Sequence, residues 1–309
     1  MRPSVAITIR SFDPEGGAMG ELRDHARITF WNQRGQRLKE EDLCVAVRDA
    51  EGVIAGTEQF TAGVLECAPH MKVISRVGSG TDSIDLVAAQ KKGIRICITP
   101  NAVVQPVAEH TVALILSVLK GIPAYDAGMR RGDHTVRTGT LLAGKTVGII
   151  GIGRIGFRVA SLLEAIGCRI RFYDPYINRE IPATWQKAAS VQDILEQCDI
   201  VTLHTGPQAD NAPVLSAERL HKARKGIVII NTARGSLIDE GAMAEALKEG
   251  TVSAAGLDVF QQEPYTGPLL AFSQVVMTPH VASNTRESRS EMELEAVHNL
   301  LTVLREKTA

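Results

Sequence analysis

One stretch, residues 146–174, constrains the fold more than any other part of the chain. It begins with the apolar run Val147–Ile150, which is typical of a buried parallel strand. Directly after the run stand three glycines in a G-x-G-x-x-G pattern: Gly151, Gly153 and Gly156. Apolar residues then recur at steps of three and four as far as Ile166, so we expect a helix that starts on the glycines and buries one face.

The properties of this stretch match those of a dinucleotide-binding turn. The first glycine permits a tight turn, the second lets the backbone approach a pyrophosphate, and the third lets helix and strand pack closely. A second predicted strand, Arg169–Tyr173, ends at Asp174. This carboxylate would accept hydrogen bonds from the adenosine ribose and repel a 2′-phosphate, so the sequence predicts NAD rather than NADP. Glycine clusters also occur in ordinary turns, but the strand, helix and acid around this one favour the cofactor.

Size and charge favour small-molecule chemistry in a protein of two domains. At 309 residues the chain is too long for one ordinary hydrophobic core. Hydrophobic residues make up 44% and charged residues 22%, which is typical of a globular protein. Thirty-four basic against thirty-five acidic side chains leave a formal net charge of −1, so we expect neither nucleic acid nor a membrane as a partner.

The cysteines give no sign of cross-linking. Five of them are scattered along the chain without a C-x-x-C pair: Cys44, Cys67, Cys97, Cys168 and Cys198. An odd, dispersed set predicts neither a disulfide framework nor a metal site, and it favours a reducing, cytoplasmic location. The first ten residues alternate like a strand and have no long apolar core, so we expect no secretory signal there.

The first third of the chain has the pattern of an α/β domain, in which short apolar runs alternate with polar, helix-capable segments. The candidate strands are Val5–Ile9, Ile28–Trp31, Cys44–Val47, Val73–Val77 and Arg95–Ile98. After the fourth of them, Gly78 and Gly80 flank Ser79. Free backbone N–H groups in such a turn can bind an anion such as a substrate carboxylate, although an ordinary glycine turn has the same spacing.

Residues Val103–Leu119 form the most apolar helix-like segment, which Pro106 and the polar residues 109–111 interrupt. It is too short for a membrane span, so we expect a buried connecting helix whose apolar sides suggest a subunit interface. His110 in this segment is better explained as a core or interface histidine than as a catalytic one. A helix end followed by a loop is expected over residues 121–144.

The alternation of strand and helix continues in the second half. The further strand candidates are Ile200–Leu203, Ile227–Ile230, Ala254–Val259 and Val275–Met277. With the two strands of the glycine-rich stretch they make six, the number of a doubly wound nucleotide-binding sheet. After Ser283 the pattern changes to one long helix, with an apolar stripe that consists of Leu294, Val297, Leu301 and Leu304.

Three of these strands lead to polar side chains that suit hydride transfer. Ligands of open parallel sheets bind at the carboxyl ends of the strands, and there the chain has Arg234, Glu263 and His280. A histidine can take the hydroxyl proton of a 2-hydroxy acid, a carboxylate can orient its ring, and an arginine can bind the substrate carboxylate. Taken singly, each could be an ordinary loop residue, so spacing alone leaves the trio open.

Six motifs in order resemble those of the D-isomer-specific 2-hydroxyacid dehydrogenases, and within them the D-3-phosphoglycerate dehydrogenase branch. They cover nearly the whole chain: VGSGTDSID (77–85), PVAEHTVALIL (106–116), GIGRIG (151–156), INTARGSLID (230–239), GLDVFQQEP (256–264) and TPHVAS (278–283). The resemblance implies two Rossmann-like α/β domains. An NAD-binding domain with a doubly wound parallel sheet, residues 101–283, would be inserted into a flavodoxin-like substrate domain, residues 1–100 plus 284–309.

The resemblance also implies roles for individual residues. The catalytic arginine, acid and base of the family match Arg234, Glu263 and His280. Contacts to NAD carry over to Gly151, Gly153, Arg154, Ile155 and Gly156 at the pyrophosphate, Asp174 and Thr205 at the adenosine, Thr232 and Ala233 at the nicotinamide ribose, and Asp258 at the carboxamide. The substrate carboxylate would be held by Gly78, Ser79, Gly80 and Arg234.

The implied reaction is hydride transfer between nicotinamide and C2 of a D-2-hydroxy acid or 2-keto acid, catalysed by a homodimer. The first candidate substrate is 3-phosphoglycerate, and reduction of hydroxypyruvate or glyoxylate is the alternative. Basic residues such as Arg48, Arg76 and Arg130 could meet a phosphate, but none has a diagnostic motif. The family also includes NADH-sensing transcriptional corepressors, and the lack of long disordered flanks favours the enzyme.

One departure from the family pattern concerns the adenine side of the cofactor site. After His204 and Thr205 the family usually continues Pro-Leu-Thr, whereas this chain has Gly206-Pro207-Gln208. We therefore expect a differently shaped loop there.

Overall fold

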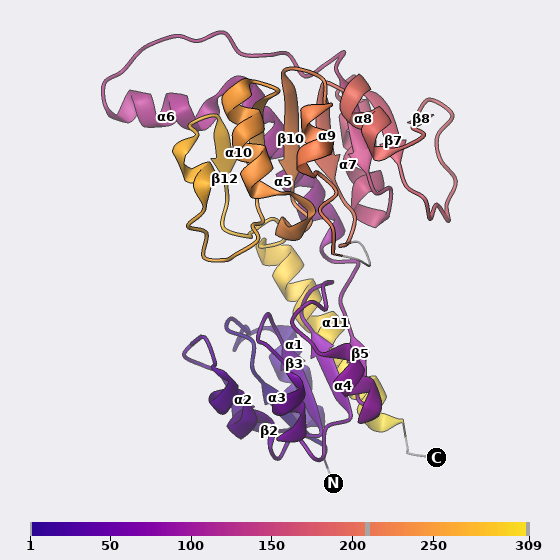
Figure 1. The fold of residues 1–309 in the computed structure, drawn as a ribbon. Coiled ribbons are helices and arrows are strands. Elements are labelled where there is room, and N and C mark those ends of the chain that lie inside the picture. The colour runs from indigo at the N-terminus through magenta and orange to yellow at the C-terminus, as the bar shows by residue number, and fades with distance from the viewer. Residues whose placement is uncertain (1, 208–210, 307–309) are drawn as a thin grey trace. The chain divides into compact units, whose positions relative to one another are not determined.

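The chain forms two compact α/β units in the computed structural model, which describes residues 2–207 and 211–306 (Figure 1). The first unit consists of Met1–Val103 and Asn284–Ala309, and the second of Val104–Ser283. Each unit has its own parallel sheet with helices packed on it. The predicted α/β fold with two Rossmann-like sheets is confirmed.

The first unit has a five-stranded parallel sheet in the order β2-β1-β3-β4-β5, the order of flavodoxin-like folds. Its strands are β1 (Ser4–Ile7), β2 (Arg27–Trp31), β3 (Gly52–Ala55), β4 (Val73–Arg76) and β5 (Arg95–Cys97). Its helices are α1 (Gly17–His25), α2 (Glu40–Val47), α3 (Ala62–Glu66), α4 (Leu86–Lys91) and α11 (Arg286–Arg305). The strand interiors β1 and β3 are completely buried, which explains their unbroken apolar runs.

The strand prediction for Cys44–Val47 is wrong, because these residues end helix α2. The helix begins with three acids, Glu40 to Asp42, which favour a helix N-terminus. Leu43, Ala46 and Val47 are its buried residues, and their steps of three and four match a helix face rather than a strand. The third strand is Gly52–Ala55, a run of four residues that was not predicted as a strand.

Helix α11 packs on the sheet of the first unit although it is the last element of the chain. It contacts α1, β3, β4 and β5, and the hydroxyl of Ser75 donates to the carbonyl oxygen of Ala296 at 2.8 Å. Val297 and Leu301 are buried as predicted, whereas Leu294 is 37% exposed and lies outside the packed stripe. Met292, Ala296 and Leu300 complete that stripe instead.

The second unit has a seven-stranded parallel sheet in the order β12-β11-β10-β9-β6-β7-β8. The strands are β6 (Thr146–Ile150), β7 (Arg169–Tyr173), β8 (Gln186–Lys187), β9 (Ile200–Leu203), β10 (Ile227–Asn231), β11 (Val252–Leu257) and β12 (Val275–Met277). Counted from β6, this is the doubly wound 3-2-1-4-5-6 order with one strand more. The six predicted strands are present, and the two-residue edge strand β8 was missed because its exposed Gln and Lys carry no apolar pattern.

The remaining helices of the second unit flank this sheet. They are α5 (Val104–Lys120), α6 (Ile122–Arg130), α7 (Arg154–Ala165), α8 (Val191–Gln197), α9 (Ala217–His221) and α10 (Glu240–Glu249), with the 3-10 turns η1 (Gly235–Leu237) and η2 (Pro268–Ala271). Helix α5 packs on α7 and β11. Pro106 lies in the first turn of α5, where a missing N–H costs no helical hydrogen bond, so the predicted interruption does not occur.

Helix α6 and the loop after it project from the second unit (Figure 1). The prediction of a helix end followed by a loop over 121–144 is therefore wrong in its first part, because Ile122–Arg130 forms a helix of its own. Residues 131–141 are all exposed. In the described part of the chain, no single helix is long and apolar enough to cross a membrane, although the bent pair α5 and α6 meets that test by length and composition.

The prediction that no cysteines pair is also wrong. Cys44 on α2 and Cys67 at the end of α3 form a disulfide, with their Cα atoms 5.2 Å apart. Cys97, Cys168 and Cys198 are free. The pair lies 23 residues apart in sequence without a C-x-x-C pattern, so only the packing of α2 on α3 brings it together.

Candidate active site

The glycines after β6 are required by close backbone packing. Gly151 has φ +91°, and a Cβ atom there would lie 2.5 Å from the carbonyl oxygen of His204. A Cβ atom at Gly156 would overlap the carbonyl oxygen of Gly151. At Gly153 nothing lies within 4 Å of the same position, so the backbone is open there to a ligand. This geometry is compatible with the roles that the sequence predicts for the three glycines.

The start of helix α7 fits the diphosphate of NAD. Its N-cap, Gly153, provides no side-chain cap, so the first N–H groups of the helix, including those of Arg154 and Ile155, remain available to an anion. The backbone nitrogen of Thr205 would lie 2.9 Å from a Cβ atom at Gly151, which places the end of β9 directly beside the turn. Gly206 and Pro207 follow without regular structure, and Gln208 lies outside the described residues.

Asp174 is fixed at the end of β7, next to the glycine turn. One carboxylate oxygen accepts the N–H of Ile152 at 2.9 Å, and the other accepts the N–H of Tyr176 at 2.8 Å. Each oxygen has a second lone pair, so the carboxylate can still accept ribose hydroxyls. The position therefore fits the role predicted for Asp174.

The histidine beside the turn, His204, is held as a neutral ring. Its Nε2 lies 2.9 Å from the hydroxyl of Thr202. Burial lowers its pKa to about 3. A charged histidine is thus disfavoured beside the turn, and it is the carbonyl group and the Cβ of His204, respectively, that lie close to Gly151 and Gly156.

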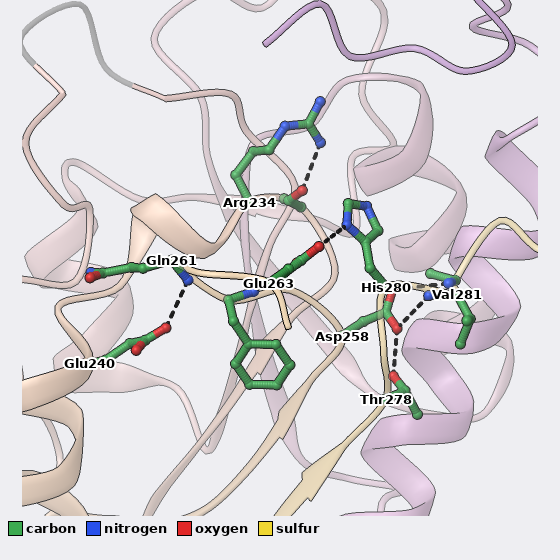
Figure 2. Close-up of polar contacts among 11 residues, drawn as sticks. Arg234, Glu240, Asp258, Gln261, Glu263, Thr278, His280 and Val281 are labelled. Carbon is green, nitrogen blue, oxygen red and sulfur yellow. Dashed lines mark hydrogen bonds and ion pairs between the residues drawn. The ribbon is translucent and has the colours of Figure 1, made fainter. Parts of the chain in front are cut away.

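The three predicted catalytic residues follow neighbouring strands. Arg234 comes after β10, Glu263 after β11 and His280 after β12, and these strands are adjacent and parallel. Gly235 packs so closely on the backbone of Phe260 that no Cβ would fit there. This contact brings the turn after β10 against the turn after β11, and Figure 2 shows the three side chains in one region.

Asn231 shapes the turn that carries Arg234. It is completely buried at the end of β10, where its amide accepts the N–H of Ala233 at 3.0 Å and donates to the carbonyl oxygen of Arg234 at 2.8 Å. The guanidinium of Arg234 donates to the carbonyl oxygen of Ala233 at 2.7 Å (Figure 2). Sequence reasoning gave Asn231 no role, and its only signal was a polar residue that ends an apolar strand.

Glu263 and His280 form a direct pair. Nδ1 of His280 lies 2.9 Å from Oε2 of Glu263, and the other oxygen of Glu263 accepts the N–H of Phe260 at 3.2 Å (Figure 2). The side chains are 47% and 39% exposed, respectively, so both can be reached by a small molecule. A carboxylate on Nδ1 leaves Nε2 as the nitrogen that can exchange a proton with a substrate.

Asp258 holds the turn on which His280 stands. It is completely buried and accepts the hydroxyl of Thr278 at 2.5 Å and the N–H groups of Val281 and Ala282 at 2.9 Å each. Burial alone would raise the pKa of Asp258, but donors that include His110 and Thr278 outweigh it and lower the pKa below its ordinary value. Asp258 is thus an ionised anchor for the turn.

The side chain of Thr232 is held by a hydrogen bond to Thr111 on helix α5. It is nearly buried, and its hydroxyl lies 2.9 Å from that of Thr111 on α5. The hydroxyl of Thr111 donates to the carbonyl oxygen of Val107 at 2.7 Å. Because Thr111 has one proton to give, it must accept the proton of Thr232.

The predicted carboxylate-binding turn lies in the first unit, after β4. The N–H of Gly78 is bound to the hydroxyl of Thr99 at 2.7 Å, so the expectation that it is free is wrong. The N–H groups of Ser79 and Gly80 make no hydrogen bond within the described residues. Gly78 has φ +138°, and its Cα faces the guanidinium of Arg76 so closely that a Cβ would overlap it. A cation therefore stands beside the turn.

The other basic residues considered for a phosphate are placed elsewhere. Arg48 is exposed after α2, and Arg130 on α6 pairs with Asp126 at 2.9 Å. Among the residues that the structure describes, no three His, Cys, Asp or Glu side chains are grouped to hold a metal.

Comparison with known proteins agrees with this geometry. The family model described as the D-isomer specific 2-hydroxyacid dehydrogenase NAD binding domain matches residues 112–282, more than half of the chain. The D-3-phosphoglycerate dehydrogenase of Mycobacterium bovis is 38% identical over 81% of this chain and 48% of its own length. The chain thus spans about half the length of such relatives.

Two further proteins are similar over nearly their whole lengths. The glyoxylate reductase of Thermofilum pendens is 35% identical over 98% of this chain and 92% of its own. The crystal structure of the TT0316 protein from Thermus thermophilus has a TM-score of 0.89 and 34% identity, and the match covers 97% of this chain and 96% of that one. The chain therefore belongs to the D-isomer-specific 2-hydroxyacid dehydrogenase family, and residues 112–282 lie in its NAD-binding domain.

Proposed function

We propose that this protein is an NAD-dependent dehydrogenase that interconverts a D-2-hydroxy acid and its 2-keto acid. The observation that carries the proposal is the 2.9 Å contact between His280 and Glu263 at the carboxyl ends of strands that also carry Arg234. NAD, when bound, accepts or returns the hydride of C2. The chain's own residues move the proton and orient the substrate.

His280 is the proposed acid and base. Glu263 accepts the Nδ1 proton of the ring, which fixes the tautomer and stabilises the imidazolium that forms when Nε2 takes the hydroxyl proton. In the reverse direction the same nitrogen returns that proton to the carbonyl oxygen. Arg234 is proposed to bind the substrate carboxylate and polarise the oxygen on C2, because a guanidinium matches a carboxylate in a planar fork.

The cofactor contacts are proposed as the sequence predicts them. The turn of Gly151, Gly153 and Gly156, with Arg154 and Ile155, would hold the diphosphate, and Asp174 and Thr205 would bind the adenosine. Thr232 and Ala233 would contact the nicotinamide ribose. Asp258 is proposed for the carboxamide as well as for its observed role in the turn of His280.

We propose two candidate substrate classes, a phosphorylated hydroxy acid first and a small 2-keto acid as the alternative. Relatives named D-3-phosphoglycerate dehydrogenase favour 3-phosphoglycerate. A relative that matches 98% of this chain is named glyoxylate reductase, which supports glyoxylate or hydroxypyruvate as the alternative. The Ser79–Gly80 turn, with Arg76 beside it, is proposed to bind the substrate carboxylate.

A substrate panel tests this proposal. Purified protein is assayed for NADH formation with 3-phosphoglycerate, D-glycerate, D-lactate and glycolate, and for NADH consumption with hydroxypyruvate and glyoxylate. His280→Ala serves as the matched inactive control. Turnover of at least one D-acid, absent with the L-isomer and in the variant, supports the proposal, and no turnover with any member would refute it.

We also propose that the protein is a homodimer whose contact includes α6 and the loop after it. The exposed apolar side chains of this region are Ile122, Met129, Val136 and Leu141. Exposure of these apolar side chains to water is costly, and a second copy would cover them. Light scattering of the wild type and of Val136→Asp would test this, since a monomeric wild type would exclude the dimer.

A cytoplasmic location without nucleic acid or membrane partners stays a prediction. The net charge of −1 still supports the absence of a polyanionic partner. The argument from unpaired cysteines no longer supports a reducing compartment, because Cys44 and Cys67 are paired.

A further inference from the structure

Helix α5 supports the turn of His280 through a residue to which the proposed chemistry assigns no role. Nε2 of His110 lies 3.0 Å from the hydroxyl oxygen of Thr278 and 3.5 Å from Oδ1 of Asp258. The His110 side chain is only 22% exposed, and Asp258 is not exposed at all. A nearly enclosed row of three polar groups thus joins the first half of α5 to the turn after β12.

The direction of the hydrogen bonds in this row follows from the charge of Asp258. Its lowered pKa keeps the carboxylate ionised near neutral pH, so it accepts only. The single proton of the Thr278 hydroxyl is therefore given to Asp258 at 2.5 Å. Nε2 of His110 must then be the donor to Thr278, which places a proton on Nε2.

The turn needs this support because His280 has an unusual backbone. Its φ is +54°, in the left-handed region that disfavours a residue with a side chain. Such a conformation persists only where neighbouring groups hold it. Here Asp258 does so, through its carboxylate bonds to the N–H groups of Val281 and Ala282 and through its carbonyl oxygen, which accepts the N–H of His280 at 2.8 Å.

We infer that His110 is a positioning residue for His280, acting through Thr278 and Asp258. Its Nε2–H binds the hydroxyl oxygen of Thr278, which in turn donates to the buried carboxylate of Asp258. Without this donor, Thr278 and Asp258 lose the hydrogen-bonded connection to α5 that His110 provides, and the turn gains freedom to move. The inference rests on the proposed function, because it concerns the placement of the proposed base.

Two substitutions of similar size separate the donor from its packing. His110→Leu fills the space without a donor, whereas His110→Gln places an amide N–H near the position of Nε2. We expect His110→Leu to lower kcat roughly 10- to 100-fold, since small misplacements of reacting groups cost that much. His110→Gln should stay within about threefold of the wild type, and the Kd of NADH should change little in either variant. Ser117→Ala, two turns along α5, is the control for a change on this helix.

A second variant interrupts the same row from the other side. Thr278→Val removes the hydroxyl with little change of volume. Because both changes act through one path, the double variant His110→Leu/Thr278→Val should lose little more activity than the worse single variant. If the fold-loss of kcat in the double variant equals the product of the two single losses, the two residues act independently and the inference is overturned.

A readout without turnover keeps the inference apart from the proposed function. Amide hydrogen exchange of Val281 and Ala282 should speed up in His110→Leu and not in His110→Gln. Unchanged exchange, unchanged kcat in His110→Leu, or an equal loss in His110→Gln would each overturn the inference. If the wild type oxidises no acid but the two His110 variants show the expected difference in exchange, the proposed function alone is refuted.

Discussion

Nδ1 of His280 lies 2.9 Å from Oε2 of Glu263, and Nε2 of His280 makes no hydrogen bond within the described residues. The ring is therefore held from one side and available on the other. We expect His280→Ala to lower kcat by roughly 10²- to 10⁴-fold, the usual contribution of a general acid or base. The Kd of NADH, measured by fluorescence titration, should stay within about twofold. Undiminished turnover would remove His280 from the mechanism.

Replacement of Asp174 should change the cofactor preference. Asp174→Asn keeps an acceptor for the N–H of Ile152 or Tyr176 but removes the charge that would repel a 2′-phosphate. We expect weaker NADH binding and a ratio of kcat/KM for NADPH over NADH that rises at least tenfold. Asp193→Asn, in a carboxylate that pairs with Arg171 elsewhere in the same unit, is the matched control. An unchanged ratio would argue against the ribose role.

The elements around the glycine turn could be predicted because their signals are local. The spacing of Gly151, Gly153 and Gly156 and the apolar runs of β6 and β7 all lie within one short stretch of sequence. The placement of Arg234, Glu263 and His280 followed from one rule, that parallel strands end at the same edge. These parts of the fold and site needed no knowledge of distant contacts.

What the sequence could not provide depends on residues far apart in the chain. The short run Cys44–Val47 fits a strand or a helix, and packing on α3 and the acids before it decide for the helix. The roles of His110 and Asn231 arise from hydrogen bonds to turns that carry other residues. The sequence around a polar residue that adjoins an apolar run does not indicate which distant turn its side chain will bind.

Reduction of the Cys44–Cys67 disulfide should destabilise the first unit. A cross-link over 23 residues restricts the unfolded chain, and a loop of this size contributes about 3 kcal/mol. We expect Cys44→Ser to lower the unfolding free energy of this unit by that order, followed by the fluorescence of Trp31 in a Trp185→Phe background. Cys97→Ser, at a free thiol, should have a smaller effect. Denatured, unreduced protein should show three reactive thiols, and five would mean that the pair is not oxidised.

The second unit should lose stability as the pH falls below about 6.5, because of His204. The folded pKa of about 3 lies far below the unfolded value of about 6.5. Between these values the unfolded chain binds a proton that the folded chain does not, so the unfolding free energy decreases by up to about 1.4 kcal/mol per pH unit. His204 as a whole residue is only partly buried, so the measured loss should be smaller than this limit.

His204→Gln tests this effect, since it retains a partner for Thr202 but does not titrate. Urea unfolding at pH 7.5 and 5.5 is followed by Trp185 fluorescence in a Trp31→Phe background. The difference between the two pH values should be smaller in His204→Gln than in the parent, because all other titrating groups are shared. If both proteins lose the same stability between the two pH values, the neutral His204 ring does not contribute.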